Sequence, residues 1–142
     1  MLNVAYTVGR ILLPLIFIVS GVQKLTNVAS VAQMLQDNSV PVPDEIVPYL
    51  GGIPKFEAVG YLIGAIEVIC GLMIMLGLKA RWGAVVLVLF TACTIYFVHH
   101  FWNMQGAEYM SNMQEALKNV AIMGGLLLVA ACGSTPNPLD ER

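Results

Sequence analysis

The residues of this chain whose types and positions could support chemistry are charged side chains inside long apolar segments. Arg10 lies in an apolar segment that runs from Val4 to Val22, and Glu67 interrupts another that runs from Ala58 to Leu78. A charge at the centre of a membrane span costs at least ~2.5–3.5 kcal/mol, so such a residue faces other helices and requires a partner. Ion pairing and proton relay are the chemistry that these positions favour.

The depths of these two residues predict that they meet. At 1.5 Å per residue, Arg10 lies roughly 9 Å from one membrane surface and Glu67 roughly 14 Å from the other. In a hydrocarbon layer of about 30 Å the two levels differ by about 7 Å, which an arginine side chain can span. An Arg10–Glu67 pair could fix helix register, or it could belong to a head-group site or proton path for a membrane-soluble ligand such as a quinone. The third alternative is that the two residues never meet.

Further polar side chains gather toward one end of the apolar segments. Lys24 and Lys118 lie near the ends of their segments, where a long side chain can also extend to the membrane surface. The third segment, from Trp82 to Trp102, carries four polar residues in its corresponding half: Thr94, Tyr96, His99 and His100. The sequence therefore predicts a polar cluster in one half of a helical bundle.

The pattern of histidines, methionines and cysteines does not favour a strong metal site. Adjacent helical residues point about 100° apart, so His99 and His100 cannot face one ion together. We expect both to form hydrogen bonds at the membrane interface. The sequence contains no haem-type histidine pair, nucleotide fingerprint or iron–sulfur motif. The cysteines are interpreted as apolar packing residues: Cys70, Cys93 and Cys132.

The elements that carry these residues are predicted to be membrane-spanning helices. Of the 142 residues, 58% are hydrophobic and only 11% are charged, which excludes a disordered chain, a coiled coil and a nucleic-acid binder with a basic face. Four segments are long enough to cross a bilayer, and none alternates as a strand would. The fold class is therefore all-α, a single domain over residues 1–142 whose partner is the lipid bilayer. The expected spans are 4–25, 58–78, 82–102 and 117–133.

The connections between these spans differ in length. The first, Gln23 to Glu57, contains an amphipathic stretch after Asn27 or Ser30 as a cap, with apolar residues at helical spacing: Val28, Val31, Met34 and Leu35. The second is a minimal hairpin of Lys79-Ala80-Arg81, and the third runs from Asn103 to Ala116. Basic residues in the short hairpin predict that it faces the cytoplasm with both termini, including the tail at Arg142, and that the longer connections face outward.

Backbone-breaking and small residues predict local features of the bundle. Pro14 is expected to kink the first span, because proline removes a helical hydrogen bond. Gly60-x-x-x-Gly64 and Gly71 in the second span are expected to form close helix–helix contacts. Trp82 and Trp102, at the two ends of the third span, suit the aromatic belts of a membrane protein.

The chain resembles the DoxX family of small membrane proteins from about Gly9 to Gly133. The resemblance rests on the order of short motifs across four spans: Arg10, Ser20-Gly21-x-x-Lys24-Leu25, Glu67-x-x-x-Gly71, Gly77-x-x-x-Arg81, His100-Phe101 and Lys118-Asn119. The family is named for a small subunit associated with archaeal quinol oxidase and thiosulfate:quinone oxidoreductase. The resemblance implies a four-helix protein of the inner membrane in a quinone-linked setting.

Two classes of function follow for a protein of this kind. In the first, the chain is an accessory or anchoring subunit of a quinone-linked redox system rather than a complete oxidoreductase, with a redox protein or a second copy as partner. No cofactor other than a quinone is expected, and the candidate binding residues are Arg10, Lys24, Glu67, His100 and Lys118. In the second, the chain is a non-catalytic scaffold or small transporter whose buried Arg–Glu pair is structural.

Overall fold

The computed structural model describes residues 2–134 of the chain and confirms the all-helical fold class. Within these residues, four segments are long and apolar enough to cross a membrane: Val4–Thr26, Lys55–Leu76, Ala80–Asn103 and Gly106–Cys132. The predicted position of the tail at Arg142 lies outside the described residues.

The first span consists of two helices, α1 (Leu2–Leu12) and α2 (Leu15–Thr26), separated at Leu13 and Pro14. The break confirms the predicted effect of Pro14, whose nitrogen cannot donate to the preceding turn. Helix α3 (Val28–Asp37) follows directly and confirms the amphipathic stretch. Asn27 occupies its N-cap position, although its side chain forms no capping hydrogen bond.

The second and third spans form a tight hairpin after the short 3-10 helix η1 (Asp44–Tyr49). Helix α4 (Lys55–Leu76) ends at Gly77, which has the left-handed conformation (φ 74°) that glycine adopts without strain. Helix α5 (Ala80–Phe97) begins immediately afterwards, and the 3-10 helix η2 (Phe101–Asn103) follows it.

Helix α6 (Gly106–Cys132) is longer than the sequence predicted. The stretch from Asn103 to Ala116 was expected to be a connection, but the helix includes all of it from Gly106 onward. Hydropathy shows where a chain enters the bilayer and not where its helix begins, and this stretch is rich in alanine, glutamate, glutamine and methionine, which favour helix. At 1.5 Å per residue, 27 residues extend about 40 Å, more than a hydrocarbon layer of about 30 Å.

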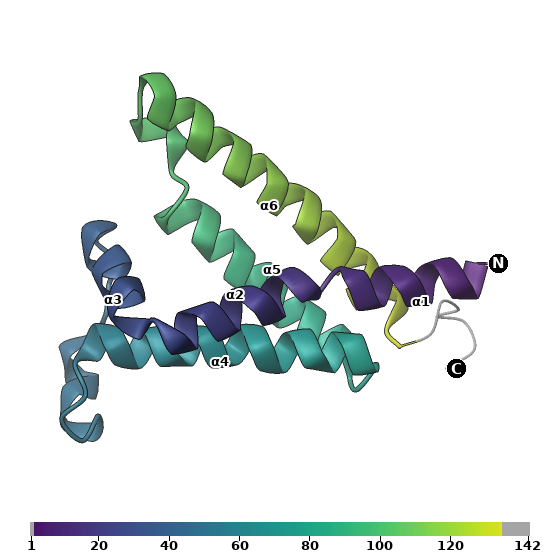
Figure 1. The fold of residues 1–142 in the computed structure, drawn as a ribbon, viewed down its shortest axis with the longest axis horizontal. Coiled ribbons are helices and arrows are strands. Elements are labelled where there is room, and N and C mark those ends of the chain that lie inside the picture. Colours follow the sequence, from purple (N-terminus) through teal and green to yellow (C-terminus); the bar gives the residue numbers. More distant parts are fainter. Residues whose placement is uncertain (1, 135–142) are drawn as a thin grey trace.

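The helices form two arms that meet at one end and separate at the other (Figure 1). Helices α2 and α4 pack along each other in one arm, α5 and α6 in the other, and α4 and α5 join the two at the closed end. Helix α3 packs on α4 near the open end. The apolar core belongs to the closed end, where Ile74, Leu87 and Leu126 have no exposed surface.

Glycines set how closely α2 and α4 approach. A Cβ atom added at Gly21 would lie 2.7 Å from the carbonyl oxygen of Gly64, and one at Gly64 would lie 2.8 Å from Cγ of Leu25. An added Cβ atom at Gly71 would lie 2.7 Å from Ile18 of α2, and one at Gly60 would lie 2.8 Å from Val28 of the neighbouring α3. These contacts confirm the predicted close packing, which lets the backbones pair in one register.

Candidate functional site

The most deeply buried charged side chain that the structure describes is Glu67, in the middle of α4. Its residue is only 2% exposed. Its carboxylate contacts Lys24 of α2, whose Nζ lies 3.0 Å from Oε1 and 2.8 Å from Oε2. Ser20 completes the cluster: its hydroxyl donates to Oε1 at 3.2 Å, and it accepts a hydrogen bond from Lys24 Nζ. We refer to Ser20, Lys24 and Glu67 as the polar triad.

Local sequence explains how the triad assembles. Ser20 and Lys24 are four residues apart, so they lie on one face of α2. Gly21 lies between them and packs against Gly64 and the Cβ atom of Glu67, so the small residues bring the carboxylate within reach of both side chains. The ion pair offsets the cost of placing two charges at membrane depth. The same close packing therefore determines both the α2–α4 contact and the polar site.

The predicted Arg10–Glu67 pair is wrong. Arg10 Nη1 instead donates to the carbonyl oxygen of Ile74 at 2.9 Å, at the C-terminal end of α4. A Cβ atom at Gly77 would lie 2.5 Å from this Nη1, so the glycine makes room for the guanidinium. The same carbonyl oxygen also accepts a hydrogen bond from the backbone N–H of Gly77, and a cation at a helix C-terminus complements the helix dipole. Arg10 thus belongs to the closed end, away from the triad.

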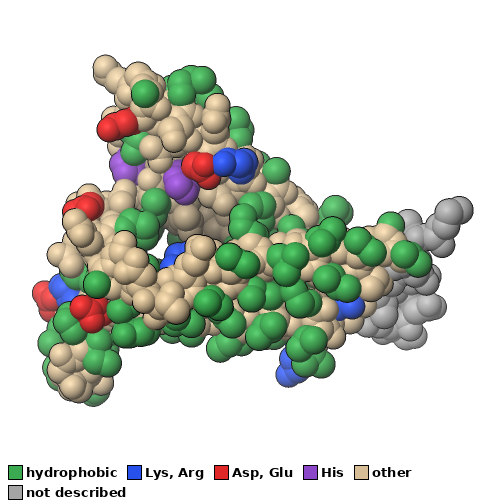
Figure 2. Space-filling view, viewed as in Figure 1, with side chains coloured by type: hydrophobic (Ala, Val, Ile, Leu, Met, Phe, Trp, Pro, Cys, Tyr) green, Lys and Arg blue, Asp and Glu red, His purple; other side chains and the backbone are tan. Residues whose placement is uncertain are grey.

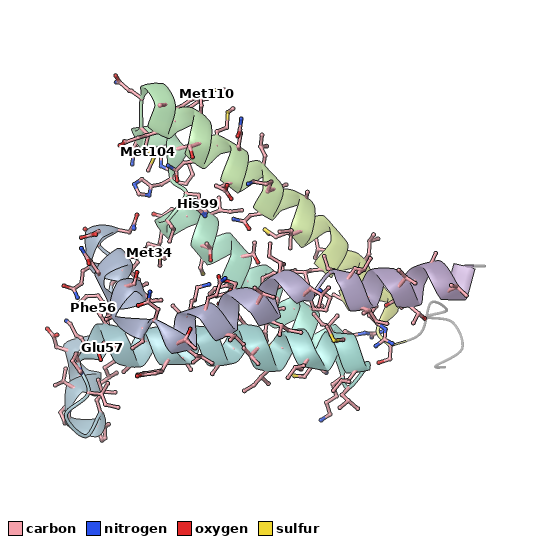
Figure 3. All side chains as sticks on the ribbon, in the orientation of Figure 1. Met34, Phe56, Glu57, His99, Met104 and Met110 are labelled. Carbon is pink, nitrogen blue, oxygen red and sulfur yellow. The ribbon has the colours of Figure 1, made fainter. Side chains whose placement is uncertain are left out.

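The triad lines a cavity of about 610 Å³ between the two arms. Figure 2 shows the molecule hollowed between the arms, and Figure 3 shows Met34 on α3 and His99 at the end of α5 on opposite sides of the open end. The walls are mainly apolar, with aromatic rings from Phe17, Phe90 and Phe97. Polar groups other than the triad also face it, and they lie on α5, just after α5 and on α6: Thr91, Thr94, His99, Glu115 and Asn119. The predicted gathering of polar residues toward one half of the bundle is confirmed for Lys24, Thr94 and His99, which line the cavity with Glu67. Tyr96, His100 and Lys118 were expected in the same cluster but do not line this cavity.

The remaining candidate residues lie outside this cavity. Lys118 is exposed on α6 and pairs with Glu115 at 2.5 Å. His100 lines a smaller cavity of about 320 Å³ with Tyr96 and Trp102. The structure therefore brings Lys24 and Glu67 together, and it places Arg10, His100 and Lys118 elsewhere.

The histidines form hydrogen bonds, as the sequence predicted. Nδ1 of His99 lies 3.1 Å from Oδ1 of Asn112, and Nδ1 of His100 lies 3.0 Å from the carbonyl oxygen of Phe97. Within residues 2–134, no group of three or more histidine, cysteine or acidic side chains could hold a metal ion.

Sequence reasoning missed several residues of the cavity wall. Thr91 is 2% exposed, and its hydroxyl donates to the carbonyl oxygen of Leu87 in its own helix. Asn119 was noted only as part of a motif. The available signal was spacing: Thr91 and Thr94, and likewise Glu115 and Asn119, lie three or four residues apart on one helix face.

The architecture and the buried ion pair define a small integral membrane protein of the helical-bundle class. The DoxX family model matches residues 5–100, and the chain belongs to this family. It is 31% identical over 135 residues to inner membrane protein YphA of Escherichia coli (strain K12), covering 95% of this chain and 87% of that protein. It is also 29% identical to inner membrane protein YqjF of the same organism, over 98% and 92% of the two chains. No solved structure matches the chain.

Proposed function

We propose that this protein is a multi-pass inner-membrane subunit that anchors or assists a quinone-linked redox system and holds a quinone in its cleft. The observation that carries the proposal is the cavity of about 610 Å³, whose apolar walls converge on the polar triad. Apolar pockets of this size with a few placed polar groups are typical binding sites for small molecules. The membrane location is supported by four apolar spans and by the names of the two relatives.

The chemistry of the cavity fits a quinone head group. The ammonium group of Lys24 presents a donor to a carbonyl oxygen, and Phe17, Phe90 and Phe97 offer surfaces for a flat ring. The side chain of Lys24 is 22% exposed, whereas that of Glu67 is 3% exposed, so an occupant would meet the lysine first. The carboxylate would hold the ammonium group in place. Electrons would then pass between the bound quinone and a partner protein.

The alternative is a scaffold or small transporter in which the Lys24–Glu67 pair is structural. This reading is favoured by the tight α2–α4 contact around Gly21 and Gly64, since the ion pair would fix the same register. It predicts that a variant whose cavity is filled by a larger side chain folds normally. It also predicts that the native protein retains no quinone.

Gentle extraction from the native membrane, followed by mass spectrometry of bound quinones, lipids and proteins, tests the proposal. Cys93 lines the cavity and Val120 is exposed on α6 outside it, so Cys93→Trp and Val120→Trp form a matched pair. We expect the native protein and Val120→Trp to retain quinone and Cys93→Trp to lose most of it. Equal retention by both variants, or no quinone with the native protein, would refute the proposal.

A further inference from the structure

The polar groups that line the cavity continue from the triad toward the open end of the molecule. They lie on helices from both arms and include Lys24 of α2, Glu67 of α4, His99 just after α5 and Glu115 of α6. Helix α3 contributes only apolar residues, Met34 and Leu35. From Thr91 to Phe97 the wall extends about 9 Å along α5 toward the open end, at 1.5 Å per residue, and His99 follows it.

Among residues 2–134, the opposite end is instead occupied by the apolar core. There the space between the helices is filled by the apolar core, in which Ile74, Leu87 and Leu126 have no exposed surface. A dry, close-packed core does not conduct water, because its voids are smaller than a water molecule. The side chain of Lys24, by contrast, is reached from the cavity and is 22% exposed.

We propose that the cleft is an aqueous vestibule of the open end, through which the polar triad exchanges water and protons with that side of the membrane alone. Chains of acidic residues and histidine inside membrane proteins form proton relays. In this proposed relay, His99 and Glu115 form the outer part and the hydroxyls of Thr91 and Thr94 line the middle. Glu67 and Lys24 form its inner end. The proposal concerns the same cleft as the proposed function but needs no bound quinone.

Cysteine accessibility tests this directly in the full chain. Ser20→Cys and Val19→Cys are made separately in a background that carries Cys70→Ala, Cys93→Ala and Cys132→Ala. Residue 20 belongs to the triad, whereas neighbouring Val19 lies at nearly the same depth, is 54% exposed and does not line the cavity. Sulfonatoethyl methanethiosulfonate, which is charged and does not cross membranes, is added to intact cells or to inverted vesicles. Asp44→Cys, in the exposed η1 segment, reports which side carries the open end.

We expect Ser20→Cys to react only from the side on which Asp44→Cys reacts, about tenfold faster than Val19→Cys, because only a hydrated thiolate is an efficient nucleophile. Reaction from the opposite side would overturn the proposal. So would labelling by a membrane-permeant maleimide with none by the charged reagent, since the cleft would then be dry. Native Cys93, with only Cys70 and Cys132 replaced, gives a second readout if Ser20→Cys does not fold. A reactive thiol in a protein that retains no quinone would leave this proposal standing and remove the proposed function.

Discussion

The closed and open ends of this bundle place a cation at membrane depth in two different ways. At the closed end, Arg10 binds a backbone carbonyl beside an apolar core, and its contact completes a helix end. At the open end, Lys24 binds a buried carboxylate beside a cavity. The contact of Arg10 with a helix end is a structural one, whereas a partly exposed ion pair in a cavity can also contact an occupant. Charge at membrane depth is therefore not sufficient to identify a functional site.

The largest expected effect comes from breaking the ion pair. Lys24→Met should reduce the free energy of unfolding by about 3–5 kcal/mol, because the Glu67 carboxylate is left buried without its partner. Lys24→Met combined with Glu67→Met should recover part of the loss. Unfolding in mild micelles by a denaturing detergent measures both. A double-mutant cycle should show coupling between Lys24 and Glu67 and none between Arg10 and Glu67; the reverse result would restore the pair predicted from depth.

Core packing should matter more at the closed end than along the cavity. Leu126 is fully buried, so Leu126→Ala should cost about 2–5 kcal/mol through lost contacts and the space left behind. Leu89 lines the cavity and is 63% exposed, so Leu89→Ala should change stability by no more than about 0.5 kcal/mol. The same unfolding assay compares them. Equal losses would mean that the two ends are packed alike.

The glycine contacts should have an intermediate effect. Gly64→Ala places a Cβ atom against Leu25 and the Gly21 backbone and should cost about 1–3 kcal/mol by forcing α2 away from α4. Gly124 has open space around its Cβ position, so Gly124→Ala is the control and should leave stability unchanged or raise it by up to about 1 kcal/mol. Similar behaviour of the two variants would show that the helix approach does not depend on Gly64.

The smallest effect is expected at Lys118. Its side chain is 64% exposed and pairs with Glu115 within one turn of α6, an arrangement worth no more than about 1 kcal/mol. Lys118→Met should therefore leave both the unfolding free energy and quinone retention close to native values. Loss of quinone in this variant would extend the binding site beyond the cavity described above.

The sequence predicted the class of fold well and the polar contacts poorly. The reason is that the contacts depend on how one helix is aligned along another. Local composition within single segments predicts the four spans, the break at Pro14 and the close contacts of Gly64. The Arg10–Glu67 pair was inferred by measuring depths from the ends of apolar segments, as if all spans began at the same level. The packing of Gly21 against Gly64 instead aligns α2 with α4 so that Lys24 faces Glu67 and Arg10 reaches Ile74.

Photo-crosslinking with a diazirine-bearing quinone tests most directly whether the open end is a binding site and the closed end is not. Labelled peptides from the purified protein are identified with and without excess unlabelled quinone. We expect competed labels on the cavity faces of α2, α5 and α6, around Ser20, Thr94 and Asn119, and a strong reduction in Cys93→Trp. Labels that lie on the outer, lipid-facing surfaces, or that persist in the presence of unlabelled quinone, would contradict the account.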